Sequence, residues 1–368
     1  MGTMETPSRA GSAETSAQAQ ALVNWELAAS TAARLTPAGP TLGAKEIGAA
    51  VENLRLMADL SVPHVHDITG LEAARDLRDS SVLVVDRASW AKANTQSFAV
   101  MLQPAIEKML EGRRGTISPG SASVGGAITG SQLGAILAFL SSKVLGQYDP
   151  FSALAPGSTA PAAGRLLLVA PNIISVEREL NVAPEDFRLW VCLHEETHRV
   201  QFTANPWLRD HVFSEVEALA ATMDAQTLLS DGLSRIGEAI KGNGNLLEAI
   251  SSPEQRAIMD RVTGMMSLLE GHADVVMDGV GPSVIPTVAT IREAFNKRRK
   301  GTGSLDRIVR RLLGLEQKMA QYRDGAVFVR AVIDRVGMEQ FNTVWSGPET
   351  LPSKDEIYAP DAWIKRVL

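Results

Sequence analysis

Hydrophobic positions recur at three- and four-residue spacing over most of this chain, which is the pattern of amphipathic helices. Two early examples are "LVNWELAASTAARL" and "KEIGAAVENLRLMADL", separated by the turn-rich "TPAGPTLG". The pattern returns after residue 184, where Pro184 suits the first position of a helix and Glu185 and Asp186 suit its first turn. This helix should end near Asn205 and Pro206.

Two short runs rich in β-branched and aliphatic residues depart from that pattern. "SVLVVD" covers Ser81 to Asp86 and "RLLLVAP" covers Arg165 to Pro171, and both are predicted strands. Between them lies "SPGSASVGGAITGSQLG", whose glycines resemble a phosphate loop but lack the Lys and Ser/Thr of a Walker motif. We interpret this run as a tightly packed or flexible connection. The predicted fold class is therefore mainly α, of α+β type, with few short strands.

The ends and the composition limit the organisation of the chain. Residues 1–20 have no apolar run and are rich in Ser, Ala, Gly and Gln, which predicts a disordered tail rather than a signal peptide. Residues 21–368 are expected to form a single domain, with a helical part at about 21–160 and a metal-site part at about 161–368. The apolar stretch "LGAILAFL" is too short to cross a bilayer. A soluble, cytoplasmic protein without a membrane partner is expected.

Charge and cysteine content argue against a nucleic-acid-binding protein and against a disulfide-stabilised one. The net charge is −6 and the pI is about 5.6, which argues against a nucleic-acid partner. The sole cysteine, Cys192, has no partner for an intrachain disulfide, and its apolar neighbours predict a small buried residue.

The strongest chemical signal is "VCLHEETHRVQF", in which His194, Glu195 and His198 have the spacing H-E-x-x-H. On a helix, His194 and His198 project from one face, one turn apart, so both imidazoles can bind a single metal ion. Glu195 can then approach a metal-bound water as general base. Zinc suits this arrangement, because it lowers the pKa of bound water and polarises a carbonyl. One Zn²⁺ per chain is expected.

A catalytic zinc needs a third protein ligand, and the residues just after His198 supply no further histidine. "SLLEGHADVVMDG" offers Glu270 as that ligand, with Asp274 one turn later to hydrogen-bond a ligand histidine. His272 is the rival third ligand, or a group that stabilises the transition state. Tyr148 and Tyr322 are further candidates for the latter role.

These motifs carry a family resemblance. The chain resembles the zincin-like family of actinobacterial proteins classed as zinc-dependent metalloproteases, one branch of which is labelled as associated with coenzyme F-420 biosynthesis. The resemblance runs from about Val23 to the C-terminus and rests on "VNWELA", "DITGLE", "VVDRASW", "LGQYDPF", "LLLVAPNI", "DFRLWVCLHEETHRVQF", "PWLRDHV", "EGHADVVMD" and "QYRDGAVF". It implies a zincin-type fold and zinc hydrolase chemistry.

Three functions follow from these observations. The first is a gluzincin-type zinc metallopeptidase that acts on a peptide or protein substrate. The second is a zinc-binding scaffold without proteolytic activity, against which the intact Glu195 argues. The third, implied by the resemblance alone, is an auxiliary factor in F-420 metabolism. The sequence does not determine the substrate or the oligomeric state.

Overall fold

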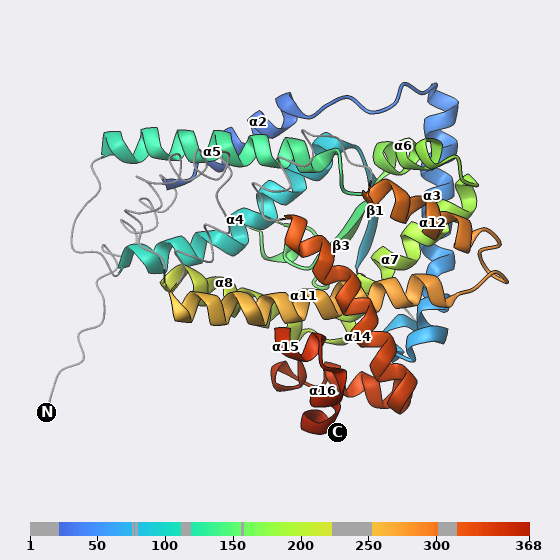
Figure 1. Ribbon diagram of the computed structural model, residues 1–368. Coiled ribbons are helices and arrows are strands. Elements are labelled where there is room, and N and C mark those ends of the chain that lie inside the picture. Colours follow the sequence, from blue (N-terminus) through green and yellow to red (C-terminus); the bar gives the residue numbers. More distant parts are fainter. Residues whose placement is uncertain are drawn as a thin grey trace, which may run out of the picture.

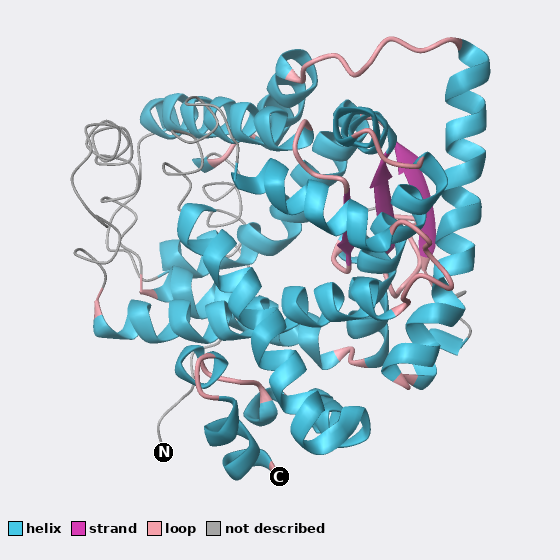
Figure 2. Cartoon of the chain, turned by 45° about the vertical axis from the view of Figure 1, so that its right-hand side comes forward, coloured by secondary structure: helices cyan, strands magenta, loops and turns pink. Residues whose placement is uncertain are grey.

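The computed structural model describes residues 22–75, 77, 80–111, 119–155, 158–222, 252–300 and 315–368, and this part of the chain is mainly helical (Figures 1 and 2). The predicted tail at residues 1–20 lies outside the described residues. The α-helices are α2 (Trp25–Leu35), α3 (Ala44–Thr69), α4 (Arg87–Glu111), α5 (Pro119–Ser141), α6 (Ala170–Leu180), α7 (Pro184–Ala204), α8 (Trp207–Ala221), α11 (Pro253–Gly279), α12 (Val288–Lys300), α14 (Leu315–Phe341), α15 (Lys354–Ile357) and α16 (Pro360–Val367). Short 3₁₀ turns are η1 (Glu72–Arg75), η2 (Ser152–Leu154), η3 (Asn342–Trp345) and η4 (Pro348–Thr350).

A small three-stranded sheet lies among these helices (Figure 2). Its order is β1-β3-β2, with β1 (Ser81–Val85) parallel to β3 (Arg165–Val169) and β2 (Gly146–Asp149) antiparallel to β3. Both predicted strands are confirmed. The four residues after Arg165 in β3 are buried, which explains their continuous apolar run, since a central strand is covered on both faces. The mainly helical α+β fold is thus as predicted.

Helix α7 carries the H-E-x-x-H motif, and many of its side chains are buried. It begins at Pro184 and ends at Ala204, as predicted, with Pro at the first turn and Asn205 at its end. It contacts α3, α11, β2 and β3, so it is enclosed by packed elements rather than exposed on one face. Asp186 in its first turn accepts hydrogen bonds from the backbone and the hydroxyl of Thr287.

Helix α11 connects two parts of the hydrophobic core. Val276 and Met277, near its C-terminal end, pack in the cluster that also contains α3, α6 and α7. Met265 and Leu268, two to three turns earlier, pack in a second cluster with α14 and the C-terminal segment. Residue 270 therefore lies where the two clusters meet.

The crossing of α11 and α14 is unusually close. A β-carbon at Gly271 would lie 2.2 Å from the backbone carbon of Gly325, so both positions require glycine. This contact between two backbones fixes the height and rotation of α11 beside Glu270.

Two local features depart from what the sequence pattern alone indicates. His64 and His66 alternate as in an extended segment, yet α3 continues through Pro63 to Thr69. Val65 and Thr69 are buried, and this tertiary packing outweighs the local cost of the proline. The small-residue run before residue 135 is helix α5, which packs against α2, so it is a packing element rather than a connection.

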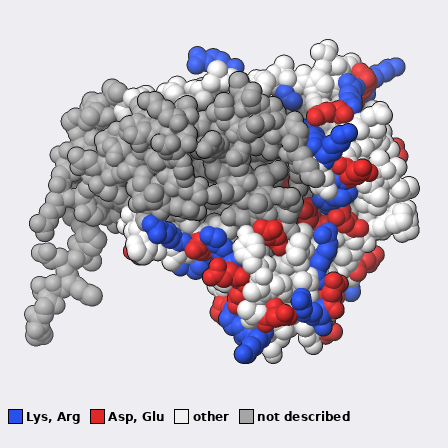
Figure 3. Space-filling view, viewed as in Figure 1, with Lys and Arg blue, Asp and Glu red and all other residues white. Residues whose placement is uncertain are grey.

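Within the described residues, no helix is long and apolar enough to span a membrane. On the face shown in Figure 3, acidic and basic side chains lie next to one another over the C-terminal helices. Some of these side chains form ion pairs, such as Lys354–Asp260 and Arg366–Glu356, and the paired side chains are partly or largely exposed.

Candidate metal centre

His194, His198 and Glu270 form one cluster of ligand atoms. The two histidine Nε2 atoms lie 3.2 Å apart. Glu270 approaches from α11, with Oε2 3.5 Å from His194 Nε2 and Oε1 3.8 Å from His198 Nε2. All three side chains are only partly buried, so the cluster is accessible from one side.

The donor set and its spacing fit zinc. Zinc bound at about 2.0–2.1 Å in a tetrahedral site holds its ligand atoms roughly 3.3–3.4 Å apart. The three separations here, 3.2, 3.5 and 3.8 Å, surround that value without movement of the backbone. Two imidazoles and one carboxylate, three protein ligands rather than four, are typical of catalytic rather than structural zinc sites.

The pKa values of the two histidines are shifted in opposite directions. Burial alone would lower the pKa of His194, but the hydrogen bond and the negative charge of Glu270 raise it. For His198, burial dominates and lowers the pKa, with the charge of His194 acting in the same direction. The negative charge of Glu270 raises the pKa of both imidazoles, so this carboxylate favours a positive charge between them.

Glu195 lies beside this cluster but outside the ligand group. Its side chain is buried, and burial raises its pKa to about 7, with the negative charges of Glu270 and Glu196 adding to the effect. The backbone of β2 presses against it, because a β-carbon at Gly146 would lie 2.6 Å from Glu195 Cδ. Glycine at position 146 therefore makes room for the carboxylate.

A buried glutamine connects the cluster to the protein interior. His198 Nδ1 lies 2.9 Å from Gln201 Oε1. Gln201 Nε2 lies 2.9 Å from the carbonyl oxygen of Leu269 and 3.0 Å from His272 Nδ1. Both Gln201 and His272 are fully buried.

His272 is not placed as a metal ligand. Its ring stacks on Phe341 and meets Trp345 edge-on, so it is enclosed by aromatic side chains of the C-terminal segment. Its Nδ1 is occupied by Gln201, and burial lowers its pKa to about 3. Glu270, rather than His272, joins the two helix-borne histidines.

Asp274 differs from expectation in its partner. The predicted hydrogen bond to a ligand histidine is not formed among the described side chains, because Asp274 Oδ1 accepts from Arg292 of α12. The guanidinium of Arg292 lies over the ring of Trp190 and also donates to Asp278. Arg292 therefore holds Asp274, and the side-chain partner of the ligand histidine His198 is Gln201.

Of the two tyrosine candidates, only Tyr148 has a side chain that the structure describes. Tyr148 in β2 packs against Phe202 of α7, and its hydroxyl donates to the carbonyl of Ala163. Its hydroxyl is thus directed to a loop of the chain. Tyr322 lies in α14 at a position whose side chain is outside the described residues.

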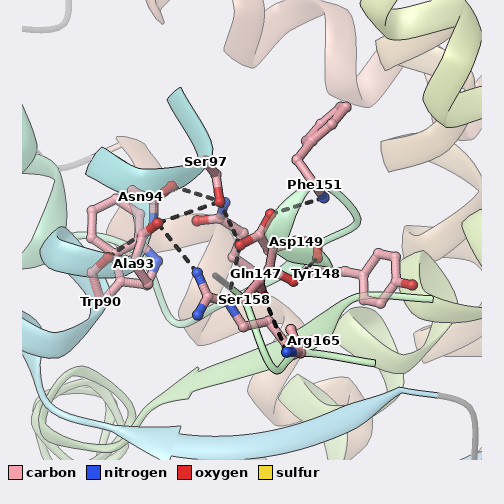
Figure 4. A network of polar contacts seen from close by, with 12 residues as sticks. Trp90, Ala93, Asn94, Ser97, Gln147, Tyr148, Asp149, Phe151, Ser158 and Arg165 are labelled. Carbon is pink, nitrogen blue, oxygen red and sulfur yellow. Dashed lines mark hydrogen bonds and ion pairs between the residues drawn. The ribbon is translucent and has the colours of Figure 1, made fainter. Parts of the chain in front are cut away.

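Strand β2 is held against the centre by a polar network on its other face (Figure 4). Asp149 is buried and accepts from Ser97 Oγ at 2.6 Å and Arg165 Nε at 3.0 Å. Gln147 donates to Asn94 Oδ1 at 2.9 Å. Because side chains alternate along a strand, these residues face α4, while Gly146 and Tyr148 face α7.

A second buried pair anchors the motif helix itself. Arg199 donates to both carboxylate oxygens of Glu196 at 3.2 and 3.1 Å. It also donates to the hydroxyl and the carbonyl of Ser80 and to the carbonyl of Leu77, just before β1. Burial raises the pKa of Glu196 to about 7, against the lowering effect of Arg199. The pair fastens α7 to the start of the sheet.

The structure thus adds two residues that the sequence did not single out. Gln201 follows His194 and His198 at the i+7 position of the same helical face, which was a visible but weak signal. Gly146 gave no local signal, since its role arises from a contact with a residue 49 positions later in the chain.

A helix that carries H-E-x-x-H, joined by a carboxylate from a second helix, is the metal site of the zincin class. Comparison with known proteins agrees, because the sequence pattern of the zincin-like metallopeptidases matches residues 23–364. The chain belongs to the zincin-like metallopeptidase family. A search of curated proteins gave no match.

A solved structure supports the same class. The chain is similar to a protein from Chloroflexus aurantiacus whose crystal structure is described as that of a "putative hydrolase with a novel fold". The two are 34% identical with a TM-score of 0.65, and the match covers 94% of this chain and 98% of that chain. Family and neighbour together indicate a hydrolase.

Proposed function

We propose that this chain is a zinc-dependent peptidase of gluzincin type. The observation that carries the proposal is the convergence of His194, His198 and Glu270 from two helices, with a second carboxylate, Glu195, beside them and outside the ligand group. A purely structural zinc site is usually closed by four protein ligands and needs no adjacent base.

Each residue has a distinct task in this proposal. His194, His198 and Glu270 would hold one zinc ion, which when bound supplies Lewis acidity towards a carbonyl and a lowered pKa for water. Glu195 accepts the proton of the attacking water on its carboxylate and then delivers it to the leaving amine. Its raised pKa, about 7 from burial, suits a group that must both accept and release a proton near neutrality.

The position of β2 supports a peptide as substrate. Within the described residues, β2 pairs with β3 on one side only and is an edge strand of the sheet. Its first residue, Gly146, touches Glu195, so extended backbone runs beside the proposed base. An extended peptide can add to such an edge through main-chain hydrogen bonds, which recognise peptides with little dependence on their sequence.

The test compares wild type with Glu195→Gln and Glu270→Gln for zinc content and peptide turnover. Glu195→Gln should keep one zinc per chain and lose about 10²–10⁴-fold in rate, the usual worth of general acid–base catalysis. Glu270→Gln should lose zinc itself, because a neutral amide is a poorer ligand than a carboxylate. Full zinc occupancy with no cleavage of a broad peptide library would favour the scaffold function, and undiminished cleavage by Glu195→Gln would refute the mechanism.

Two finer statements stay predictions, one from the sequence composition and one from the family resemblance. A cytoplasmic location is tested by fractionation of cells that produce the protein. A link to coenzyme F-420 is tested by the F-420 content of a deletion strain, compared with the same strain carrying Glu195→Gln.

A further inference from the structure

The side-chain amide of Gln201 connects two histidines by hydrogen bonds, one of them partly exposed and the other fully buried. His198 belongs to the metal cluster and is partly exposed, whereas His272 is fully buried between Phe341 and Trp345. Gln201 lies between them and makes three hydrogen bonds of 2.9, 2.9 and 3.0 Å. Its carboxamide thus uses its oxygen and both N–H groups within the protein interior.

The orientation of this amide is determined by chemistry. The oxygen and nitrogen of a carboxamide are normally assigned from their neighbours, and here one neighbour leaves no choice. The carbonyl oxygen of Leu269 can only accept, so the atom of Gln201 that faces it must be the donor nitrogen. The amide oxygen must therefore face His198 Nδ1, and it can only accept.

The protons of both imidazoles follow from that orientation. Because Gln201 Oε1 accepts, His198 Nδ1 must carry the proton, and its Nε2 keeps a lone pair directed into the cluster with His194 and Glu270. Because Gln201 Nε2 donates to His272 Nδ1, the proton of His272 must lie on Nε2. The two histidines are opposite tautomers.

We propose that Gln201 is the positioning residue that holds His198 as its Nδ1–H tautomer, ready to bind a metal through Nε2, and that the carbonyl of Leu269 fixes the amide in this orientation while His272 Nδ1 accepts from the amide nitrogen. The proposal deepens the proposed function and rests on its assignment of His198 as a ligand. A flipped amide would bring its oxygen against the Leu269 carbonyl and lose its bond to His198, so two contacts oppose the flip. His272 is itself held by the aromatic rings of the C-terminal segment, which ties that segment to the ligand.

Zinc affinity of the full-length protein tests the positioning role, with zinc alone as the probe in competition with a chromophoric chelator. Gln201→Met keeps the length and burial of the side chain but removes all three hydrogen bonds. It should weaken zinc binding about 10–100-fold, the usual effect of removing the partner of a ligand histidine. Thr197→Val is the matched control, because Thr197 is equally buried on α7 and, among the described residues, its hydroxyl bonds to the carbonyl of Leu193 alone. Its zinc affinity should stay within about twofold of wild type.

The spectroscopic signature is independent of zinc and of activity. Long-range nitrogen–proton spectra of the zinc-free, ¹⁵N-histidine-labelled wild type should show His198 protonated on Nδ1 and His272 on Nε2, assigned from His198→Gln and His272→Phe. In Gln201→Met the His198 signal should lose the Nδ1–H pattern, and in His272→Phe zinc affinity should fall less than in Gln201→Met. The wild-type spectrum alone decides the tautomers if Gln201→Met fails to fold.

Two results would overturn the proposal. One is His198 protonated on Nε2 in the zinc-free wild type, and the other is Gln201→Met binding zinc as tightly as Thr197→Val. Failure of the proposed function looks different: wild type that binds zinc but cleaves nothing leaves both measurements intact. Wild type that binds no zinc removes the ligand assignment, while the tautomer spectrum still tests the amide orientation.

Discussion

Gly146 of β2 and Glu195 of α7 lie in contact, so closely that a single methyl group on residue 146 would lie 2.6 Å from the carboxylate carbon. Gly146→Ala should push Glu195 aside and lower peptide turnover by about 10²-fold, the typical cost of a misplacement of about 1 Å. Zinc content should not change, because Glu195 is not a ligand. Turnover and metal analysis on the same samples check both points.

The control for this glycine is Gly48→Ala in α3, where an added β-carbon meets no atom within 4 Å. It should leave turnover unchanged and raise the stability by about 0.5–1 kcal/mol, since alanine is the better helix residue. Normal turnover of Gly146→Ala would show that Glu195 does not depend on this contact.

Zinc should hold α7 and α11 together, because Glu270 on α11 completes the pair on α7. Removal of zinc with a chelator should lower the melting temperature, and free zinc at about 100 times its Kd should add about 2.7 kcal/mol to the free energy of unfolding. Glu270→Gln should lose this gain. Glu254→Gln, on the exposed first turn of the same helix, should keep it. Equal melting temperatures with and without zinc would contradict a bridge between the helices.

Arg199 should be essential for folding stability. Arg199→Met leaves Glu196 buried without its partner and also removes the donor for Ser80 and Leu77, so we expect a loss of about 3–5 kcal/mol in urea denaturation. Adding Glu196→Gln should recover part of the loss, because the unpaired charge disappears. Arg335→Met, which breaks an exposed pair with Asp361, should cost at most about 1 kcal/mol. Equal losses for both arginines would mean that burial of the pair is unimportant.

The C-terminal helices should lose stability in acid through Glu356. Burial alone would raise its pKa, but hydrogen bonds from Arg366 and Ser353 outweigh burial and lower it. The folded state therefore binds this proton more weakly than the unfolded chain, so the stabilisation is present above the ordinary pKa of 4.5 and disappears as the pH falls below it.

Glu356→Gln removes the charge alone, because a glutamine side chain can still accept the hydrogen bond from the backbone N–H of Ser353 at the start of α15. At pH 7 it should cost about 1 kcal/mol relative to wild type, and at pH 3 the difference should shrink towards zero. Denaturation at the two pH values measures it. A difference that grows on acidification would give the shift the opposite sign.

Local signals in the sequence were sufficient for α7 and for most of the metal cluster. Pro184, the acidic first turn and Asn205–Pro206 determine where α7 begins and ends, and helical geometry alone places His194 beside His198. Glu270 was predicted because a catalytic zinc needs a third protein ligand besides two histidines, and a carboxylate on a second helix can supply it. In each case the chemistry required a partner of known type.

The failures share a physical cause, which is contact between segments distant in the chain. Asp274 had the right spacing for a histidine partner, but Arg292 from another helix competes for it with a full charge. The role of Gln201 depends on Leu269 and His272, 68 and 71 residues away. Pro63 in α3 shows the same effect on secondary structure, since burial of Val65 and Thr69 outweighs a helix-breaking residue.

The three proposed zinc ligands come from two helices that are far apart in the chain, so they are synthesised at different times. The two histidines emerge with α7, but Glu270 follows 72 residues after His198, and the rings of Phe341 and Trp345 that enclose His272 come near the end of the chain. A nascent chain therefore carries the proposed base and two ligands long before it can assemble the complete centre. The neighbouring polypeptides in a crowded cell therefore meet the finished centre only after the helix that carries Glu270 has been made.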